Sequence, residues 1–197
     1  SWAWESYWIS QGLFAWIIIP WIFAFIFIPK GELMQIISES PSSAKLMAAF
    51  FGVLWGFGGL TFGLALRYLG VALGQSIALG LCAAFGTLLP PILAGDNLFA
   101  TRGGILTLIG VAITIAGIII IGYAGSLKSK EMSDAEKKAA VKEFALKKGI
   151  LIAIFAGIMS ACFNFGYEAG KPIEEVALAH GTNPLYQKNP TLIFILL

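Results

Sequence analysis

Five long apolar runs, separated by short polar or charged segments, set the pattern of this chain. Each run is roughly 20 residues long, the length that an α-helix needs to cross about 30 Å of membrane hydrocarbon. The predicted spans are residues 8–28, two spans that share residues 44–93, and residues 104–124 and 149–167. The pattern therefore predicts an all-α protein, a polytopic bundle of membrane-spanning helices.

The two spans within Ala44–Leu93 are interrupted only by Arg67–Gly70, so the chain must reach the membrane surface there and turn straight back. Glycines recur along both helices. Such spacing leaves small faces on which neighbouring helix backbones can approach closely. We expect such close packing at Gly52, Gly56, Gly59, Gly63, Gly70 and Gly74.

Prolines and polar residues predict where the other spans bend or end. Pro20 removes one backbone hydrogen bond within the first span and predicts a kink there. Pro90 and Pro91 predict the end of the third span. The polar stretches are interpreted as connections without regular structure: residues 32–43, 94–102 and 168–189.

Residues 128–148 form the one long charged segment and carry seven lysines. Ser133 and Glu136 have the spacing of a capping box, and acidic residues precede lysines by four positions, which stabilises helices. The pattern predicts an amphipathic helix on the membrane surface; a plain solvated linker helix is the alternative. Because positively charged loops favour the cytoplasm, these lysines predict a cytoplasmic linker.

Composition supports a membrane protein and excludes several other classes. Hydrophobic residues make up 58% of the chain and charged residues 12%, about half the charged share of a typical soluble domain. A net charge of +2 predicts no nucleic-acid partner. A single histidine, His180, cannot build a histidine metal cluster, and Cys82 and Cys162 both lie inside apolar spans. We therefore expect no metal, no cofactor and no enzymatic activity.

Three amide side chains stand out within the spans: Gln11, Gln75 and Asn164. Serine and threonine can bond back to their own helix, whereas an amide in a membrane needs a partner, a cavity or a substrate. Amides suit the hydroxyls of a neutral polyol, and Trp55 offers a flat aromatic face of the kind that sugar sites use. The alternatives are hydrogen bonds between helices for the amides and plain packing for the tryptophan.

Glu168 is the only carboxylate that adjoins the polar face of a span. It follows Gly149 by 19 residues, about 28 Å along a helix, which places it near a membrane edge. Asn164 stands four residues earlier, on the same helix face. If that face lines a cavity, Glu168 is a candidate for proton coupling; the alternative is a surface ion pair with Lys171.

Four segments together resemble a known family. They read WAWESYWISQGLFAWIIIPW, LWGFGGLTFGLALRYLGVALGQSIALGLCAAFGTLLPPIL, RGGILTLIGVAITIAGIIIIGYAG and EFALKKGILIAIFAGIMSACFNFGYEAGKPIEEVALAHGTNPLYQKNP. In order and spacing they are similar to the L-rhamnose–proton symporter family of the drug/metabolite transporter superfamily. The most specific feature is LRYLG followed by a glycine-rich span that ends in Thr-x-x-x-Pro.

The resemblance implies a bacterial inner-membrane protein of ten helices, arranged as two inverted five-helix repeats. On that template, residues 1–127 are helices two to five of the first repeat, 128–148 the lysine-rich linker, and 149–197 the start of the second repeat. About five full spans are then present, and we expect the chain to be an internal piece of a longer protein. The template places the linker outside the cell, opposite to what its lysines predict.

The function that the resemblance implies is symport of L-rhamnose, or a related small sugar, with a proton across the lipid bilayer. The predicted sugar-binding residues are Gln11, Trp55, Gln75 and Asn164, and the predicted proton-coupling residue is Glu168. Three alternatives stay open: an exporter of the same superfamily, another sugar permease, and a membrane scaffold subunit that transports nothing.

Overall fold

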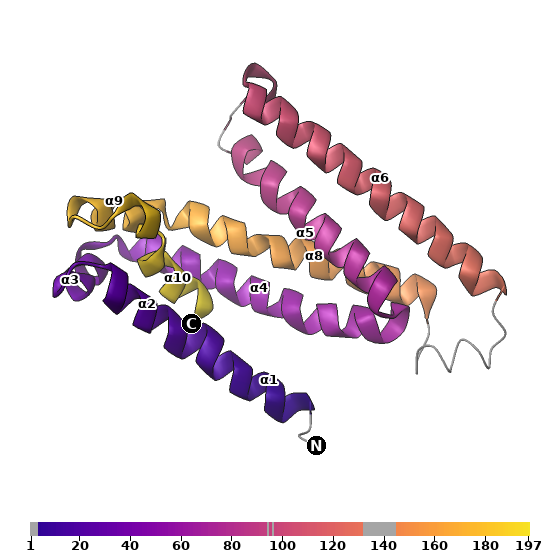
Figure 1. The fold of residues 1–197 in the computed structure, drawn as a ribbon, viewed down its shortest axis with the longest axis horizontal. Helices are drawn as coiled ribbons and strands as arrows, with labels where there is room; N and C mark the ends of the chain where they lie inside the picture. Colours follow the sequence, from indigo (N-terminus) through magenta and orange to yellow (C-terminus); the bar gives the residue numbers. More distant parts are fainter. Residues whose placement is uncertain (1–3, 94, 96, 132–144) are drawn as a thin grey trace. The chain divides into compact units, whose positions relative to one another are not determined.

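The computed structural model describes residues 4–93, 95, 97–131 and 145–197, and these residues form helices and no strands (Figure 1). The long helices are α4 (Ser42–Leu69), α5 (Val71–Leu93), α6 (Arg102–Glu131) and α8 (Leu146–Ala169). The shorter α-helices are α1 (Trp4–Gly12), α2 (Ile19–Phe27), α3 (Glu32–Glu39), α9 (Lys171–Ala179) and α10 (Asn189–Leu196). A π-helix, η1 (Leu13–Ile18), joins α1 to α2, and two 3₁₀ turns are η2 (Leu98–Ala100) and η3 (Pro184–Tyr186). The all-α prediction is confirmed.

Five helical segments of the described chain are long and apolar enough to cross a membrane. They are Ile9–Phe27, Ser42–Leu69, Val71–Leu93, Arg102–Gly125 and Leu146–Ala179. Large apolar side chains on these segments face outwards; Ile113 and Leu151 are each 68% exposed. Such surfaces suit lipid or further helices, and they confirm a polytopic helical bundle.

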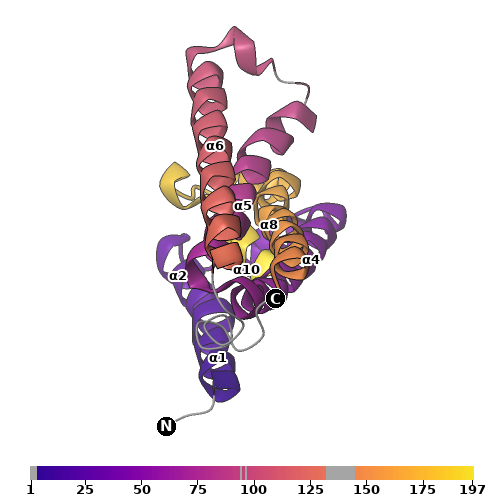
Figure 2. The ribbon, with the colours of Figure 1, turned by 90° about the vertical axis from the view of Figure 1, so that its right-hand side faces the viewer.

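The chain divides into two compact units, and α4 and α8 each contribute to both. One unit comprises Ser1–Val53 with Phe165–Leu197, and the other comprises Leu54–Asn164. In the second unit α5 and α6 lie side by side, connected through η2 (Figures 1 and 2). Its core includes Ala65, Leu69, Leu73, Ile77, Ala78, Ala153 and Ala156.

The turn between α4 and α5 consists of a single residue outside both helices. Gly70 adopts a φ of 79°, in the left-handed region that favours glycine. Its N–H donates to the Leu66 carbonyl at 2.8 Å, and its own carbonyl accepts from Gly74 at 3.0 Å. The predicted turn-back at Arg67–Gly70 is confirmed, and one glycine is enough to make it.

Some of the predicted glycine contacts are confirmed, and others are not found among the described residues. A Cβ added at Gly74 would lie 3.0 Å from the Ala65 carbonyl oxygen, and one at Gly52 would lie 1.9 Å from the Ile195 carbonyl oxygen. At Gly56, Gly59 and Gly63, however, a Cβ would meet nothing within 4 Å. These three glycines lie on sides of α4 that no described residue covers, so the close approach expected of them is not made among the described residues.

In the first unit, the irregularity predicted at Pro20 takes the form of the π-helix η1. The Ile19 N–H donates to the Phe14 carbonyl five residues earlier, and Pro20 follows in the first turn of α2. A π turn of this kind accommodates a proline, which has no N–H to continue the ladder. The core of this unit includes Ala24, Ile28, Leu33, Ile36, Ala177 and Ile193.

Two stretches predicted to be loops are helices. Within residues 32–43, α3 buries Leu33 and Ile36, one turn apart, against the first-unit core. Within residues 168–189, α9 starts at Lys171, where Pro172 fits the first turn of a helix, and buries Ile173 and Ala177. Both helices are short and carry many polar residues, so their apolar stripes are narrow. His180, just after α9, contacts Glu32 and Glu39 of α3.

The predicted linker 128–148 lies largely outside the described residues, which omit 132–144. Its ends belong to the flanking helices, because α6 continues to Glu131 and α8 starts at Leu146. The amphipathic helix and its capping box therefore stay predictions. The division of the chain into repeat segments 1–127 and 149–197 also stays a prediction.

Candidate functional site

Asn164 on α8 donates a hydrogen bond to a backbone carbonyl of α5 that lacks its helical donor because of a proline. Pro90 lies inside α5, which continues to Leu93, so the predicted end of the helix at Pro90 and Pro91 is wrong. Because proline has no N–H, the Gly86 carbonyl four residues earlier lacks its usual helical donor. Asn164 Nδ2 donates to that carbonyl at 3.1 Å. Satisfaction by a neighbouring helix explains how the helix tolerates a proline.

Gly86 makes this contact sterically possible. A Cβ at position 86 would lie 2.7 Å from Asn164 Nδ2. At nearly the same level on α8, Phe163 contacts Trp55 of α4, with ring centroids 5.2 Å apart and the planes tilted by 54°. The second unit thus brings Trp55, Asn164 and Gly86 to one level of the α4–α5–α8 packing. Trp55 remains partly exposed.

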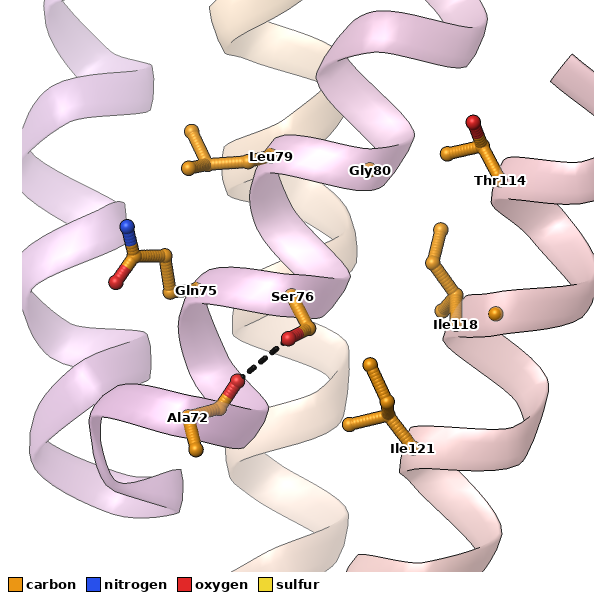
Figure 3. Close-up of a pocket in the computed structure, with 9 residues that line it drawn as sticks. Ala72, Gln75, Ser76, Leu79, Gly80, Thr114, Ile118 and Ile121 are labelled. Atoms are coloured by element: carbon orange, nitrogen blue, oxygen red, sulfur yellow. Dashed lines mark hydrogen bonds between the residues drawn. The ribbon is translucent and has the colours of Figure 1, made fainter. Parts of the chain in front are cut away.

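Gln75 lies elsewhere on α5. It precedes Gly86 by 11 residues, about 16 Å along the helix, so it does not join Asn164 and Trp55. It lies at an open pocket of about 460 Å³ between α5 and α6, within the usual range for small ligands. Figure 3 shows its side chain leaving α5 on the side away from Thr114, Ile118 and Ile121 of α6. Ser76 bonds back to the Ala72 carbonyl at 2.7 Å.

A second pocket, of about 440 Å³, lies where α5 and α6 connect. It is lined by Thr87, Pro91, Asn97, Leu98, Ala100, Thr101, Gly104 and Thr107. Hydroxyl and amide groups make it more polar than the pocket beside Gln75. Pro91 also deprives the Thr87 carbonyl of its usual helical donor. Sequence reasoning missed this pocket, because η2 and its asparagine fall in a predicted turn.

Gln11 and Glu168 belong to the first unit. Gln11 is exposed on α1, just before η1. Glu168 is in the last turn of α8 and forms an ion pair with Lys171, with 2.5 Å between Oε2 and Nζ. Both partners are substantially exposed, the Glu168 side chain by 41%. This is the geometry of the surface pair that sequence reasoning left open as the alternative.

Glu174 is a buried carboxyl that sequence reasoning missed. It lies on α9, is 8% exposed, and its Oε1 atom is buried without a hydrogen-bond partner. The spacing of Ile173 and Ala177 in the segment KPIEEVALAH could have indicated a helix with Glu174 on its packed side. Among the described residues, no group of three or more histidine, cysteine or acidic side chains is arranged to hold a metal ion.

Five apolar helical segments, with a few polar groups bonded between helices or facing pockets, define a multi-pass α-helical membrane protein. All 197 residues match the model of the family described as L-rhamnose-proton symport protein (RhaT), and the chain belongs to this family.

Two similar relatives are named L-rhamnose-proton symporter, one from Yersinia pestis bv. Antiqua (strain Antiqua) and one from Yersinia pseudotuberculosis serotype O:1b (strain IP 31758). Each is 39% identical to this chain over 198 residues. The match covers 100% of this chain but only 56% of the relative, so the chain spans little more than half the length of these proteins. No solved structure matches the chain significantly.

Proposed function

We propose that this chain is part of a secondary transporter that carries L-rhamnose, or a related small sugar, together with a proton across the bacterial inner membrane. The observation that carries the proposal is the family match over the entire chain. Membership of a symporter family also supports a role in transport rather than catalysis. We infer no cofactor, because the driving force in such a carrier is the proton gradient.

The sugar would bind through amides and an aromatic face within the bilayer. Asn164 keeps one N–H and its carbonyl oxygen for a ligand after donating to Gly86, and Trp55 is partly exposed on the adjacent helix. Gln75 lies at a separate pocket beside α6, and Gln11 lies on α1; both stay proposed sugar contacts on the strength of the sequence alone. Two-fold hydrogen bonding by amides suits the hydroxyl pairs of a neutral sugar.

Alternating access would follow from the paired repeats that the resemblance implies. In carriers with inverted repeats, substrate binds near the membrane midplane, and one half rocks against the other. We propose residues 1–127 and 149–197 as parts of the two halves, joined by the lysine-rich linker. Proton coupling further needs an acid that is charged in one step and neutral in another. Glu168 is the acid that the sequence proposes, and its ion pair with Lys171 supports the surface alternative.

The test uses the full-length protein that contains this chain, reconstituted in lipid vesicles. An inward-directed proton gradient should drive accumulation of labelled L-rhamnose, and collapse of the gradient by a protonophore should release it. D-Rhamnose, the mirror image, should compete poorly. Sugar movement only in the outward direction would favour an exporter, and an absence of both binding and transport would favour a scaffold subunit.

Glu168→Gln separates the two roles proposed for that residue. Loss of gradient-driven accumulation, with retained exchange of L-rhamnose across the membrane, would assign proton coupling to Glu168. Unchanged accumulation would assign it to the exposed pair with Lys171, which contributes under about 1 kcal/mol to stability.

A further inference from the structure

Among the side chains that the structure describes, Glu174 is the only carboxyl that is buried, with 8% of its surface exposed. Its Oε1 atom receives no hydrogen bond. A buried carboxylate with an oxygen that receives no hydrogen bond is costly in apolar surroundings, whereas the neutral acid has far less charge to solvate. The adjacent Glu175, by contrast, is exposed on the same helix.

The packing around Glu174 is tight and comes from three helices. Helix α9 packs against α3 and α10, and Ile173 and Ala177 on its packed side are fully buried. A Cβ at Gly170 would lie 2.1 Å from Thr191 Cγ2, so the corner between α8 and α9 rests directly on the first turn of α10. Glu174 follows this corner by one helical turn. A negative charge on Glu174 would therefore disturb the packing between α9 and α10.

The charged groups that act on Glu174 come from the elements around this corner. The strongest is the Lys188 ammonium, just before α10, followed by the Glu168 carboxylate and the Lys171 ammonium. Lys188 Nζ also lies 5.0 Å from the centre of the Tyr167 ring on α8. None of these groups donates to Oε1. Of the two cations, Lys171 shares α9 with Glu174, whereas Lys188 lies outside it and would attract the ionised form if α9 moved relative to α10.

We propose that Glu174 binds and releases the coupling proton, an inference that rests on the proposed function. The carboxylate takes one proton from water on the side where the sugar enters and becomes the neutral acid. In that form it is compatible with the packed arrangement of α9 on α3 and α10. Loss of the same proton to water on the other side restores the carboxylate, whose charge favours hydration or approach to Lys188. The proton is conserved, and no other reactant is required.

The experiment compares wild type, Glu174→Gln and Glu175→Gln in the full-length protein in vesicles. For one proton per sugar, a difference of one pH unit can sustain about tenfold accumulation of L-rhamnose. We expect Glu174→Gln to lose this accumulation and to keep exchange of labelled L-rhamnose at equal pH on both sides. Glu175→Gln, on the exposed side of the same helix, should keep both activities.

Accumulation by Glu174→Gln equal to that of wild type would overturn the inference and leave the proposed function intact. Absence of gradient-driven accumulation in wild type and Glu175→Gln would refute the proposed function itself, and the inference with it. If Glu174→Gln lacks exchange as well, Glu174→Asp decides the question, because it keeps a titratable group. The pH profile of accumulation should then shift; a profile identical to that of wild type would contradict proton binding at position 174.

Discussion

The imidazole Nδ1 of His180 lies 2.6 Å from Oε2 of Glu32, although 148 residues separate the two in the sequence. The other ring nitrogen, Nε2, lies 2.9 Å from Oε2 of Glu39, one heptad further along α3. The two ring nitrogens can donate at the same time only when the imidazole is protonated to imidazolium. Hydrogen bonds to the carboxylates of Glu32 and then Glu39 raise the pKa of His180 above its ordinary value of about 6.5. The end of α9 is thereby tied to α3 by a charged bridge.

This bridge predicts a pH-dependent contribution to stability. Because the pKa of His180 is raised in the folded state, the contribution is complete below the unfolded pKa of about 6.5 and disappears as the pH rises through the folded pKa. His180→Gln in the full-length protein should therefore lower the melting temperature at mildly acidic pH and have little effect at alkaline pH. Thermal unfolding in detergent across this pH range measures the difference. A pH-independent difference between variant and wild type would argue against the charged bridge. Glu175→Gln, on the exposed side of the preceding helix α9, serves as a control.

Adjacent glycines on α4 predict opposite responses to the same substitution. A Cβ at Gly58 would lie 2.7 Å from both the backbone nitrogen and Oγ of Ser160 on α8, whereas one at Gly59 meets nothing within 4 Å. Gly58→Ala should force α4 and α8 apart and cost about 1–3 kcal/mol. Gly59→Ala should be neutral or slightly stabilising, because alanine favours helix by up to about 1 kcal/mol over glycine.

Melting temperatures of the two variants in the same detergent test this contrast, with proteolysis as a second measure of folding. Equal destabilisation by Gly58→Ala and Gly59→Ala would show that the packing assigned to Gly58 is wrong, or that another segment of the longer protein covers Gly59 as closely.

Gly70 predicts a cost that depends on backbone conformation rather than on space. At a φ of 79°, an alanine is strained by about 1–2 kcal/mol, whereas asparagine tolerates this region better. We expect Gly70→Ala to destabilise the full-length protein more than Gly70→Asn. The order of the two melting temperatures is the measurement, and the reverse order would mean that the α4–α5 turn does not depend on a left-handed residue.

The sequence predicts the spans well because a membrane helix needs only length and apolarity, which residues 44–93 show plainly. It does not predict α3 and α9, because a short amphipathic helix carries too few apolar residues to differ from a polar loop. For the same reason the sequence does not predict the burial of Glu174, which depends on which side of α9 packs against α3 and α10. Spacing likewise could not tell Gly58 from Gly59, since it does not reveal where the neighbouring helix lies.

Parts of the candidate site could likewise be predicted from the sequence, and other parts could not. Sequence reasoning selected Asn164 as a polar group that must find a partner, and the structure supplies one in the Gly86 carbonyl. It could not foresee that Pro90 creates the need for this bond, because the two residues come from different helices. Nor could it separate Gln75 from Asn164, which requires knowing the level at which α8 crosses α5. Whether these residues contact a sugar stays a prediction.

The hydrogen bond between Asn164 and the Gly86 carbonyl tests whether a neighbouring helix replaces the donor that a proline removes from α5. Asn164→Ala leaves the Gly86 carbonyl without a donor and should cost about 1 kcal/mol, the usual size of a side-chain hydrogen bond between membrane helices. Pro90→Ala supplies an N–H four residues after Gly86, so the helix can satisfy this carbonyl by itself. In the Pro90→Ala background, Asn164→Ala should therefore cost less than it does alone. Unfolding free energies of the two single variants and the double variant form the cycle, and additive effects would mean that Asn164 does not replace the donor that Pro90 removes.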